Sequence, residues 1–192
     1  GLAPASKADF AFVLHALSLL KPSGNLFEIL PHGVLFRGTK EGKIRERLLE
    51  DGVIASVIGM PGKLFLNTPI PTVILNLKKE CNTSDVLFID ASNEFKKSGK
   101  QNILEQANID RIVDTYNLRK FVDRFAYLCS LSEIKENDFN LNIPRYVDTY
   151  VHEEPVDLEQ IFSELLQLKK EISENEEKLI DMFSELVPTD KS

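Results

Sequence analysis

The segment between residues 59 and 75 carries the side chain with the clearest chemical use. Phe65 lies there on a loop bounded by Gly and Pro, between two apolar runs of strand-forming residues. An aromatic ring on such a loop offers a flat face on which a nucleic-acid base can stack. Composition alone favours another role, in which Phe65 packs in a core or an interface. Both interpretations stay open on this segment alone.

His32 is the histidine whose position is informative. It follows a short apolar run, and open α/β sheets bind ligands beyond the carboxyl ends of their strands. A turn residue without a role fits the same position. His15, His32 and His152 lie far apart, and no Cys or carboxylate completes a metal-binding spacing around them. We therefore expect no metal site, and the motifs of serine hydrolases and zinc proteases are absent.

The one concentrated basic stretch lies between residues 37 and 47, which contain five basic residues and two acidic ones, Glu41 and Glu46. The five are Arg37, Lys40, Lys43, Arg45 and Arg47. Such a cluster favours contact with phosphate groups, and the alternative is the solvated face of a helix. The segment from Gly38 to Lys43 fails as a phosphate-binding loop, because its glycine spacing is one residue short and Ile44 replaces the Ser or Thr.

The elements that would position these residues alternate between helix and strand. Apolar residues at helical spacing predict a helix over 6–20, with Ser6 as N-cap and Asp9 three residues on. Further helices are expected at 41–51, 103–124 and 131–136, strands at 25–31, 53–60, 71–79 and 85–90, and irregular chain at 138–148.

This alternation predicts an α/β fold with helices on the faces of a sheet. Only about ten residues separate the strands at 53–60 and 71–79, which is too few for a parallel crossover, so we expect this pair to be antiparallel. The sheet is therefore mixed, and it corresponds to half of a doubly wound sheet.

The C-terminal tail has the most regular pattern in the chain. Apolar residues seven apart, with a second set three positions later, predict one heptad helix of about 29 residues, or roughly 43 Å. The first set is Leu158, Leu165, Ile172, Leu179 and Leu186, and the second is Ile161, Leu168, Asn175 and Met182. Asn175 is the one polar residue of the seam. A helical partner is favoured, and the alternative is a helix folded against its own domain.

Composition sets the remaining bounds. The 192 residues carry a net charge of −7, and residues 153–192 alone hold twelve acidic and four basic side chains, which leaves the body near neutral. No apolar run is long enough to span a membrane, and no signal peptide is evident. Cys81 and Cys129 fit reduced thiols, so the sequence favours a cytoplasmic protein.

Five blocks of sequence together resemble one known family. They read SKADFAFVLH at 6–15, LPHGVLFRGTKEGKIRERLLE at 30–50, VIGMPGKLFLNTPIPTVILNLKK at 57–79, LFIDASNEF at 87–95 and NDFNLNIPRYVD at 137–148. Through these blocks the chain resembles the C-terminal half of the modification (DNA methyltransferase) subunit of type I restriction-modification systems. The acidic tail is similar in kind to the family's C-terminal helices.

The resemblance implies an adenine-specific DNA methyltransferase, which transfers a methyl group from S-adenosylmethionine to N6 of adenine. It implies DNA, a specificity subunit and a restriction subunit as partners, with a second modification subunit as a further one. On this basis residues 1–100 would be the C-terminal part of a Rossmann-like catalytic domain. Residues 101–152 would be a helical and irregular family-specific segment, and 153–192 an acidic helix for assembly.

Two motifs of the family are missing from this sequence: the glycine-rich loop that holds the cofactor, and the Asn-Pro-Pro-aromatic motif that holds the target amino group. In relatives both precede the segment that begins this chain. The resemblance therefore implies a fragment with no catalytic residue and no main cofactor site, inactive by itself. The alternative is a fragment that acts only as a protein-interaction module.

The resemblance also assigns site residues. Phe65 takes the place of the aromatic residue that stacks on the flipped adenine, and Asn67 and Thr68 would shape the pocket rim. His32, between Pro31 and Gly33, would lie at a strand end near that pocket. The cations expected to contact the DNA backbone are Arg37, Lys40 and Lys43.

Overall fold

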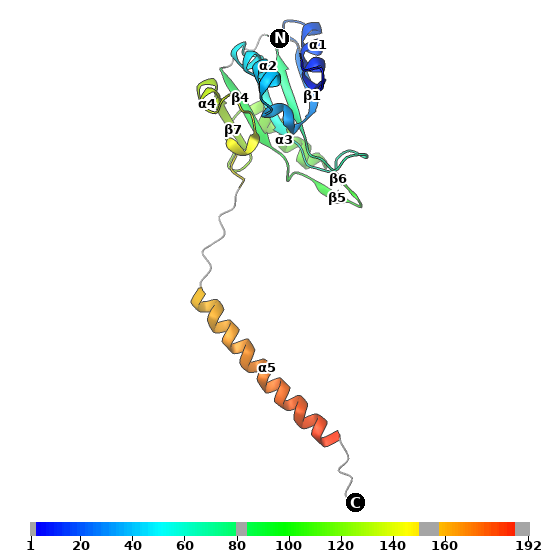
Figure 1. The fold of residues 1–192 in the computed structure, drawn as a ribbon, viewed down its shortest axis with the longest axis vertical. Helices are drawn as coiled ribbons and strands as arrows, with labels where there is room; N and C mark the ends of the chain where they lie inside the picture. The colour runs from blue at the N-terminus through cyan, green and yellow to red at the C-terminus, as the bar shows by residue number, and fades with distance from the viewer. Residues whose placement is uncertain (1–2, 80–83, 150–157, 187–192) are drawn as a thin grey trace, which may run out of the picture. The chain divides into compact units, whose positions relative to one another are not determined.

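A computed structural model describes residues 3–79, 84–149 and 158–186 (Figure 1). The chain divides into two compact units, residues 1–150 and 151–192. In chain order the elements are α1 (Asp9–Leu19), β1 (Asn25–Pro31), η1 (His32–Leu35), α2 (Thr39–Glu50), β2 (Ile54–Gly59), β3 (Thr72–Lys78), β4 (Asp85–Asp90), β5 (Lys96–Ser98), β6 (Gln101–Ile103), α3 (Gln106–Leu118), β7 (Ala126–Ser130), α4 (Leu131–Glu136), η2 (Ile143–Arg145) and α5 (Leu158–Leu186).

Five strands form one mixed sheet in the order β1-β3-β2-β4-β7. Strand β3 runs antiparallel to both of its neighbours, β1 and β2, and β2 runs parallel to β4. The antiparallel pairing expected for the strands on either side of the Phe65 loop is therefore confirmed. Because β1, β2 and β4 point the same way, their carboxyl ends meet at one edge of the sheet.

Helices cover both faces of this sheet, as expected for the α/β class. One apolar cluster joins α1, α2, α4 and the segment around η2 to one face, through residues such as Phe10, Leu48 and Ile143. A second cluster joins α3 to the other face around Ile112 and Leu87. Neighbouring strand residues alternate between the two clusters, because successive side chains of a strand point to opposite faces.

A buried arginine connects the elements of the first face. Arg45 of α2 is only 4% exposed. Its Nε donates to the Phe139 carbonyl at 2.7 Å, and its Nη1 donates to the carbonyls of Val34 at 3.1 Å and Arg37 at 2.9 Å. Because three backbone oxygens from two segments accept from one cation, Arg45 fixes η1 and the chain after α4 against α2.

Three details of the sequence prediction are wrong. Ser6 does not cap α1, because the helix begins at Asp9 with Ala8 as N-cap and without a side-chain cap bond. The helix expected over 103–124 is shorter, and the hairpin of β5 and β6 precedes it. Strand β7, which extends the sheet beside β4, was not expected. The strands at 25–31 and 85–90 have the bounds that the sequence predicted.

The second unit holds α5, the 29-residue helix that the heptads predict. Six of its apolar seam residues are each between 48% and 62% exposed, namely Ile161, Leu165, Leu168, Ile172, Leu179 and Met182. Phe162, Leu166, Ile180 and Phe183 widen this exposed apolar face toward both ends of the helix. Within the described ranges, no helix is long and apolar enough to cross a lipid bilayer. Cys81 and His152 lie outside the described residues.

Replacing Arg45 by Met should lower the free energy of unfolding by about 3 kcal/mol, because three carbonyl oxygens lose a charged donor. Urea unfolding followed by tyrosine fluorescence measures this change. The matched control is Arg47→Met, since Arg47 is exposed and, among the described residues, pairs with Asp51 alone at the surface. Its effect should stay within about 0.5 kcal/mol. Equal effects of the two replacements would contradict the role of Arg45.

Candidate functional site

The candidate site lies at the edge where β1, β2 and β4 end. The Ala91 N–H donates to the Gly59 carbonyl at 2.9 Å, which holds the ends of β2 and β4 together. The Met60 N–H donates to the Thr72 carbonyl at 2.8 Å and so fixes where the chain leaves β2 and enters β3. Ligands of open α/β sheets bind at this kind of edge. The loop of residues 60–71 stands on it.

The loop has a tight neck. The Lys63 N–H donates to the Pro69 carbonyl at 3.2 Å. At Gly62 an added Cβ would lie 2.9 Å from the same carbonyl oxygen, which is closer than carbon and oxygen can approach, so only Gly fits there. At the tip, Phe65 and Thr68 form an isolated antiparallel bridge, and the Ile70 N–H donates to Thr68 Oγ1 at 3.2 Å.

Phe65, Asn67 and Thr68 line one surface hollow of about 280 Å³. The Phe65 ring is 42% exposed, so the loop leaves an aromatic face open. The Asn67 side chain has no hydrogen-bond partner among the residues that the structure describes. The full lining is Lys63, Phe65, Leu66, Asn67, Thr68, Pro69, Lys100 and Gln101. The structure thus brings together three of the four residues expected to hold a base.

His32, the fourth, does not line this hollow; it lies near the base of the loop. It begins η1, beside the Thr72 backbone and the Asp90 carboxylate. Burial lowers the pKa of His32, and a hydrogen bond with the Thr72 backbone and the negative charge of Asp90 oppose that shift only in part. Its Nε2 is buried and finds no partner among the described residues. His32 thus lies at a strand end, as the sequence predicted, but it does not line the hollow with the other three residues.

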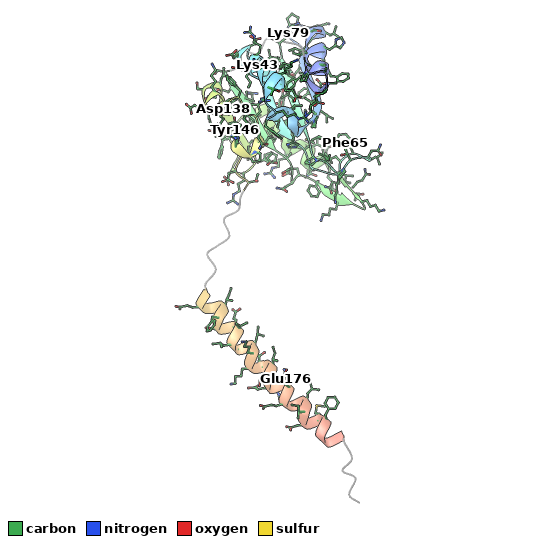
Figure 2. All side chains as sticks on the ribbon, in the orientation of Figure 1. Lys43, Phe65, Lys79, Asp138, Tyr146 and Glu176 are labelled. Atoms are coloured by element: carbon green, nitrogen blue, oxygen red, sulfur yellow. The ribbon has the colours of Figure 1, made fainter. Side chains whose placement is uncertain are left out.

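The three cations expected to contact DNA differ in their surroundings. Arg37 forms ion pairs with Asp9 at 2.8 Å and Glu41 at 3.4 Å, and these bonds raise the pKa of Arg37. Lys40 and Lys43 are exposed on α2. Lys43 lines a separate hollow of about 380 Å³, together with Arg45, Asp138 and Arg145. Figure 2 shows that Lys43 and Phe65 occupy separate parts of the folded unit.

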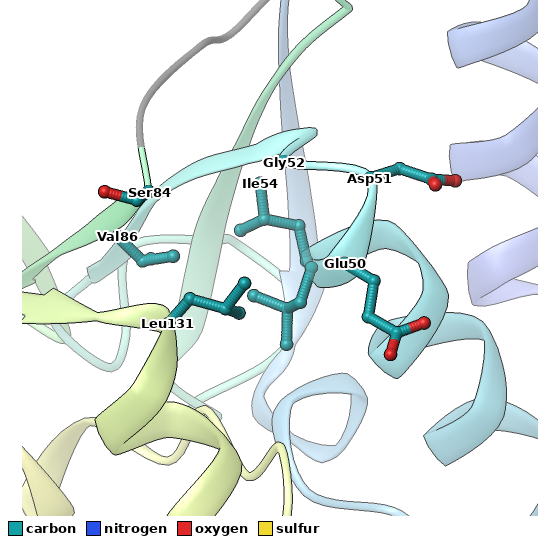
Figure 3. Close-up of a pocket in the computed structure, with 8 residues that line it drawn as sticks. Glu50, Asp51, Gly52, Ile54, Ser84, Val86 and Leu131 are labelled. Atoms are coloured by element: carbon teal, nitrogen blue, oxygen red, sulfur yellow. The ribbon is translucent and has the colours of Figure 1, made fainter.

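A further hollow of about 290 Å³ lies between α2, β2 and β4 (Figure 3). Glu50 and Asp51 lie at its rim, and Ile54, Val86 and Leu131 form apolar walls. It contains the first residues of β2 and β4, so it belongs to the opposite edge of the sheet from the Phe65 loop. No group of three or more metal-ligating side chains occurs in the part of the chain that the structure describes.

Sequence reasoning missed Lys63, Leu66 and Pro69 on the loop, and two further residues of the hollow that lie far away in the sequence. Lys100 and Gln101 come from the hairpin of β5 and β6, and the hairpin reaches the loop through Asn102. The only local signal was Ser98-Gly99 between two short polar runs, which is a weak sign of a hairpin.

Comparison with known proteins assigns this arrangement to a family. The family model for N-6 DNA methylases matches residues 1–155. The chain belongs to the N-6 DNA methylase family. A solved methyltransferase subunit of a type I restriction-modification system from Streptococcus thermophilus is 56% identical, with a TM-score of 0.76 over 78% of this chain and 32% of that one.

Curated relatives of the chain are methylase subunits of type I restriction enzymes. The type I restriction enzyme MpnII methylase subunit of Mycoplasma pneumoniae is 40% identical over 82% of this chain and 29% of that protein. The MjaVIII methylase subunit of Methanocaldococcus jannaschii is 41% identical over 76% of this chain and 26% of that protein. The chain is therefore similar to type I modification subunits and spans under a third of the length of these relatives. The N-6 DNA methylase match includes the whole sheet and the Phe65 loop and ends before α5.

The surroundings of His32 predict a pH effect on stability. The unfolded chain protonates His32 near pH 6.5, but the folded chain does so only at lower pH. Stability due to His32 is therefore present at pH 7.5 and lost as the pH falls below about 6.5. The free energy of unfolding of the wild type, minus that of His32→Gln, should decrease as the pH falls from 7.5 to 5.5. Denaturation of both proteins at several pH values measures this difference. A difference that stays constant from pH 7.5 to 5.5 would contradict the burial of His32.

Proposed function

We propose that this chain is the C-terminal part of a DNA adenine-N6 methyltransferase subunit of a type I restriction-modification complex, in which Phe65 stacks on the target adenine. The observation that carries the proposal is the exposed Phe65 ring in a hollow at the carboxyl edge of the sheet. The N6 amino group is unreachable inside a duplex, so the base must leave the stack. An aromatic face repays part of the unstacking, at about 1–3 kcal/mol per base.

Other groups of the site have roles in this proposal. The unpartnered amide of Asn67 would bond the edge of the extruded base, and Thr68 would hold the loop tip through its bond with the Ile70 N–H. His32 would support the base of the loop. Lys40 and Lys43 would contact phosphates, whereas Arg37 would hold α2 against α1 because its charge is already paired with Asp9 and Glu41.

The methyl donor of this family's reaction is S-adenosylmethionine. Among the described residues, the chain that follows β1, β2 and β4 at Pro31, Gly59 and Asp90 has no glycine-rich loop leading directly into a helix N-terminus. We therefore assign the cofactor site and the catalytic residues to the remainder of the subunit, and no step of transfer to this chain.

The outer side of β1 supports this assignment of the cofactor site to another part of the subunit. No described strand pairs with the outer side of β1, and Phe27 and Ile29 on that strand are half exposed. Phe12 and Leu19 of α1 are exposed as well. In the proposal, the other half of a Rossmann-like catalytic sheet pairs with β1 and covers these apolar side chains.

We assign α5 to subunit assembly. Its apolar face is exposed in both the N-terminal and the C-terminal half of the helix, and Asn175 interrupts it between them. A buried Asn at such a position fixes the register of paired helices. The specificity subunit is the proposed partner, with the restriction subunit and a second modification subunit as further members of the complex. The same exposed face favours the second candidate function, a chain that acts only as an interaction module.

The Phe65 role is tested in the complete modification enzyme. Phe65→Ala should slow methyl transfer to DNA by roughly 10- to 100-fold, because the stacking face is lost. Phe65→Trp, which keeps an aromatic face, should retain most of the activity. Ile70→Ala is the matched control, since Ile70 is 61% exposed on the same loop and does not line the hollow. Initial rates of methylation measure all three, and normal kinetics of Phe65→Ala would refute base stacking.

The assembly role is tested by placing charge on the α5 seam. Leu165→Glu with Leu168→Glu should abolish copurification of the subunit with its specificity subunit, because both side chains would be buried at the interface. The control is Ser163→Glu with Lys170→Glu, which adds two acidic groups outside the seam. Circular dichroism checks that both variants keep the helix. Equal copurification of the two double variants would argue against a heptad interface.

A further inference from the structure

The hairpin of β5 and β6 is a polar projection of the first unit (Figure 1). All three residues of β5 are exposed, and a two-stranded hairpin is at best marginally stable alone. Gly99 has a φ of +60° at the first position of its two-residue turn, as a type II′ turn requires. The hairpin adds no residue to either apolar cluster. Packing of the core therefore does not explain its presence.

Asn102 attaches this hairpin to the Phe65 loop. Its N–H donates to the Lys63 carbonyl at 3.0 Å, and its Nδ2 donates to the Gly62 carbonyl at 2.8 Å. Lys97 is the cross-strand partner of Asn102, so both side chains leave the same face of the hairpin. The Lys97 side chain therefore leaves the hairpin on the same side as the Asn102 amide that bonds the loop.

Lysines gather where the hairpin meets the loop. Lys63, Lys97 and Lys100 are exposed, and among the described residues none of them has an ion-pair partner. The nearby acidic groups are already paired, since Glu105 bonds Lys96 and Glu94 bonds Arg111. Lys63 and Lys100 also line the hollow that contains Phe65. The hollow thus has an aromatic face and an uncompensated positive rim.

We propose that Lys63, Lys97 and Lys100 bind phosphates of the DNA strand on either side of the base that Phe65 holds. This inference rests on the proposed function and adds phosphate contacts at the rim of the hollow and on the hairpin to the base stacking and to the basic stretch at 37–47. Lysine is a flexible point charge that suits phosphate without reading sequence, which is appropriate where another subunit selects the site. The aromatic face beside the cations favours nucleic acid over an acidic protein.

The test uses the complete modification enzyme with Lys97→Gln and Lys100→Gln combined. Binding to a DNA duplex with the recognition site is measured between 50 and 200 mM salt. Each lost phosphate contact should reduce the slope of log affinity against log salt by about 0.9, and the pair should weaken binding about 30-fold at 0.15 M salt. The control is Lys120→Gln with Lys135→Gln, which removes two exposed lysines elsewhere and should keep the wild-type slope.

The outcomes separate this inference from the proposed function. A wild-type enzyme that methylates DNA, with a reduced slope only in the hairpin variant, supports the phosphate contacts. A wild-type slope in the hairpin variant overturns them and leaves the Phe65 role standing. Loss of the specificity subunit from the hairpin variant, with an unchanged slope, also overturns them and indicates a protein contact. A wild-type enzyme that neither binds nor methylates DNA overturns the proposed function itself.

Discussion

The insertion of β3 between β1 and β2 is the constraint on which the rest of the structure depends. Because β3 is antiparallel to both neighbours, β1 and β2 must run the same way, and β4 then pairs parallel to β2. Three strands consequently deliver their carboxyl ends to one edge. The same insertion makes the chain cross that edge between β2 and β3, and the crossing is the loop that carries Phe65. The order of the strands in the sheet therefore also determines where the site lies.

Polar side chains hold in place the segments of the first unit that strand pairing does not hold. Arg45 joins α2 to three backbone oxygens, and Arg119, in a left-handed conformation after α3, donates to the carbonyls of Ala55 and Asp85. Asn102 does the same for the loop from a hairpin forty residues later. Each of these side chains donates to carbonyl oxygens of segments far away in the sequence. The shape of the site thus depends on side-chain bonds between distant segments as well as on the sheet.

Sequence patterns predicted the parts of the fold that are set locally. Strands β1 and β4 are short apolar runs between turn residues, and the ten-residue connection determined the antiparallel return at β3. The hairpin of β5 and β6 escaped notice because Lys96–Ser98 and Gln101–Ile103 have no apolar alternation, and contacts with the loop hold them. Phe65, Asn67 and Thr68 were expected from the family resemblance. Lys100 and Gln101 were not, because only tertiary contacts bring them to the hollow.

The open edge of β1 has a consequence for handling the chain by itself. Strand β1 has seven residues, includes the half-exposed Phe27 and Ile29, and has an outer side that no described strand pairs, so it is a template on which a second copy can add its own strand. Expressed alone, the chain should therefore associate with itself as its concentration rises. Solubility, rather than loss of folding, would then limit the yield of the isolated chain.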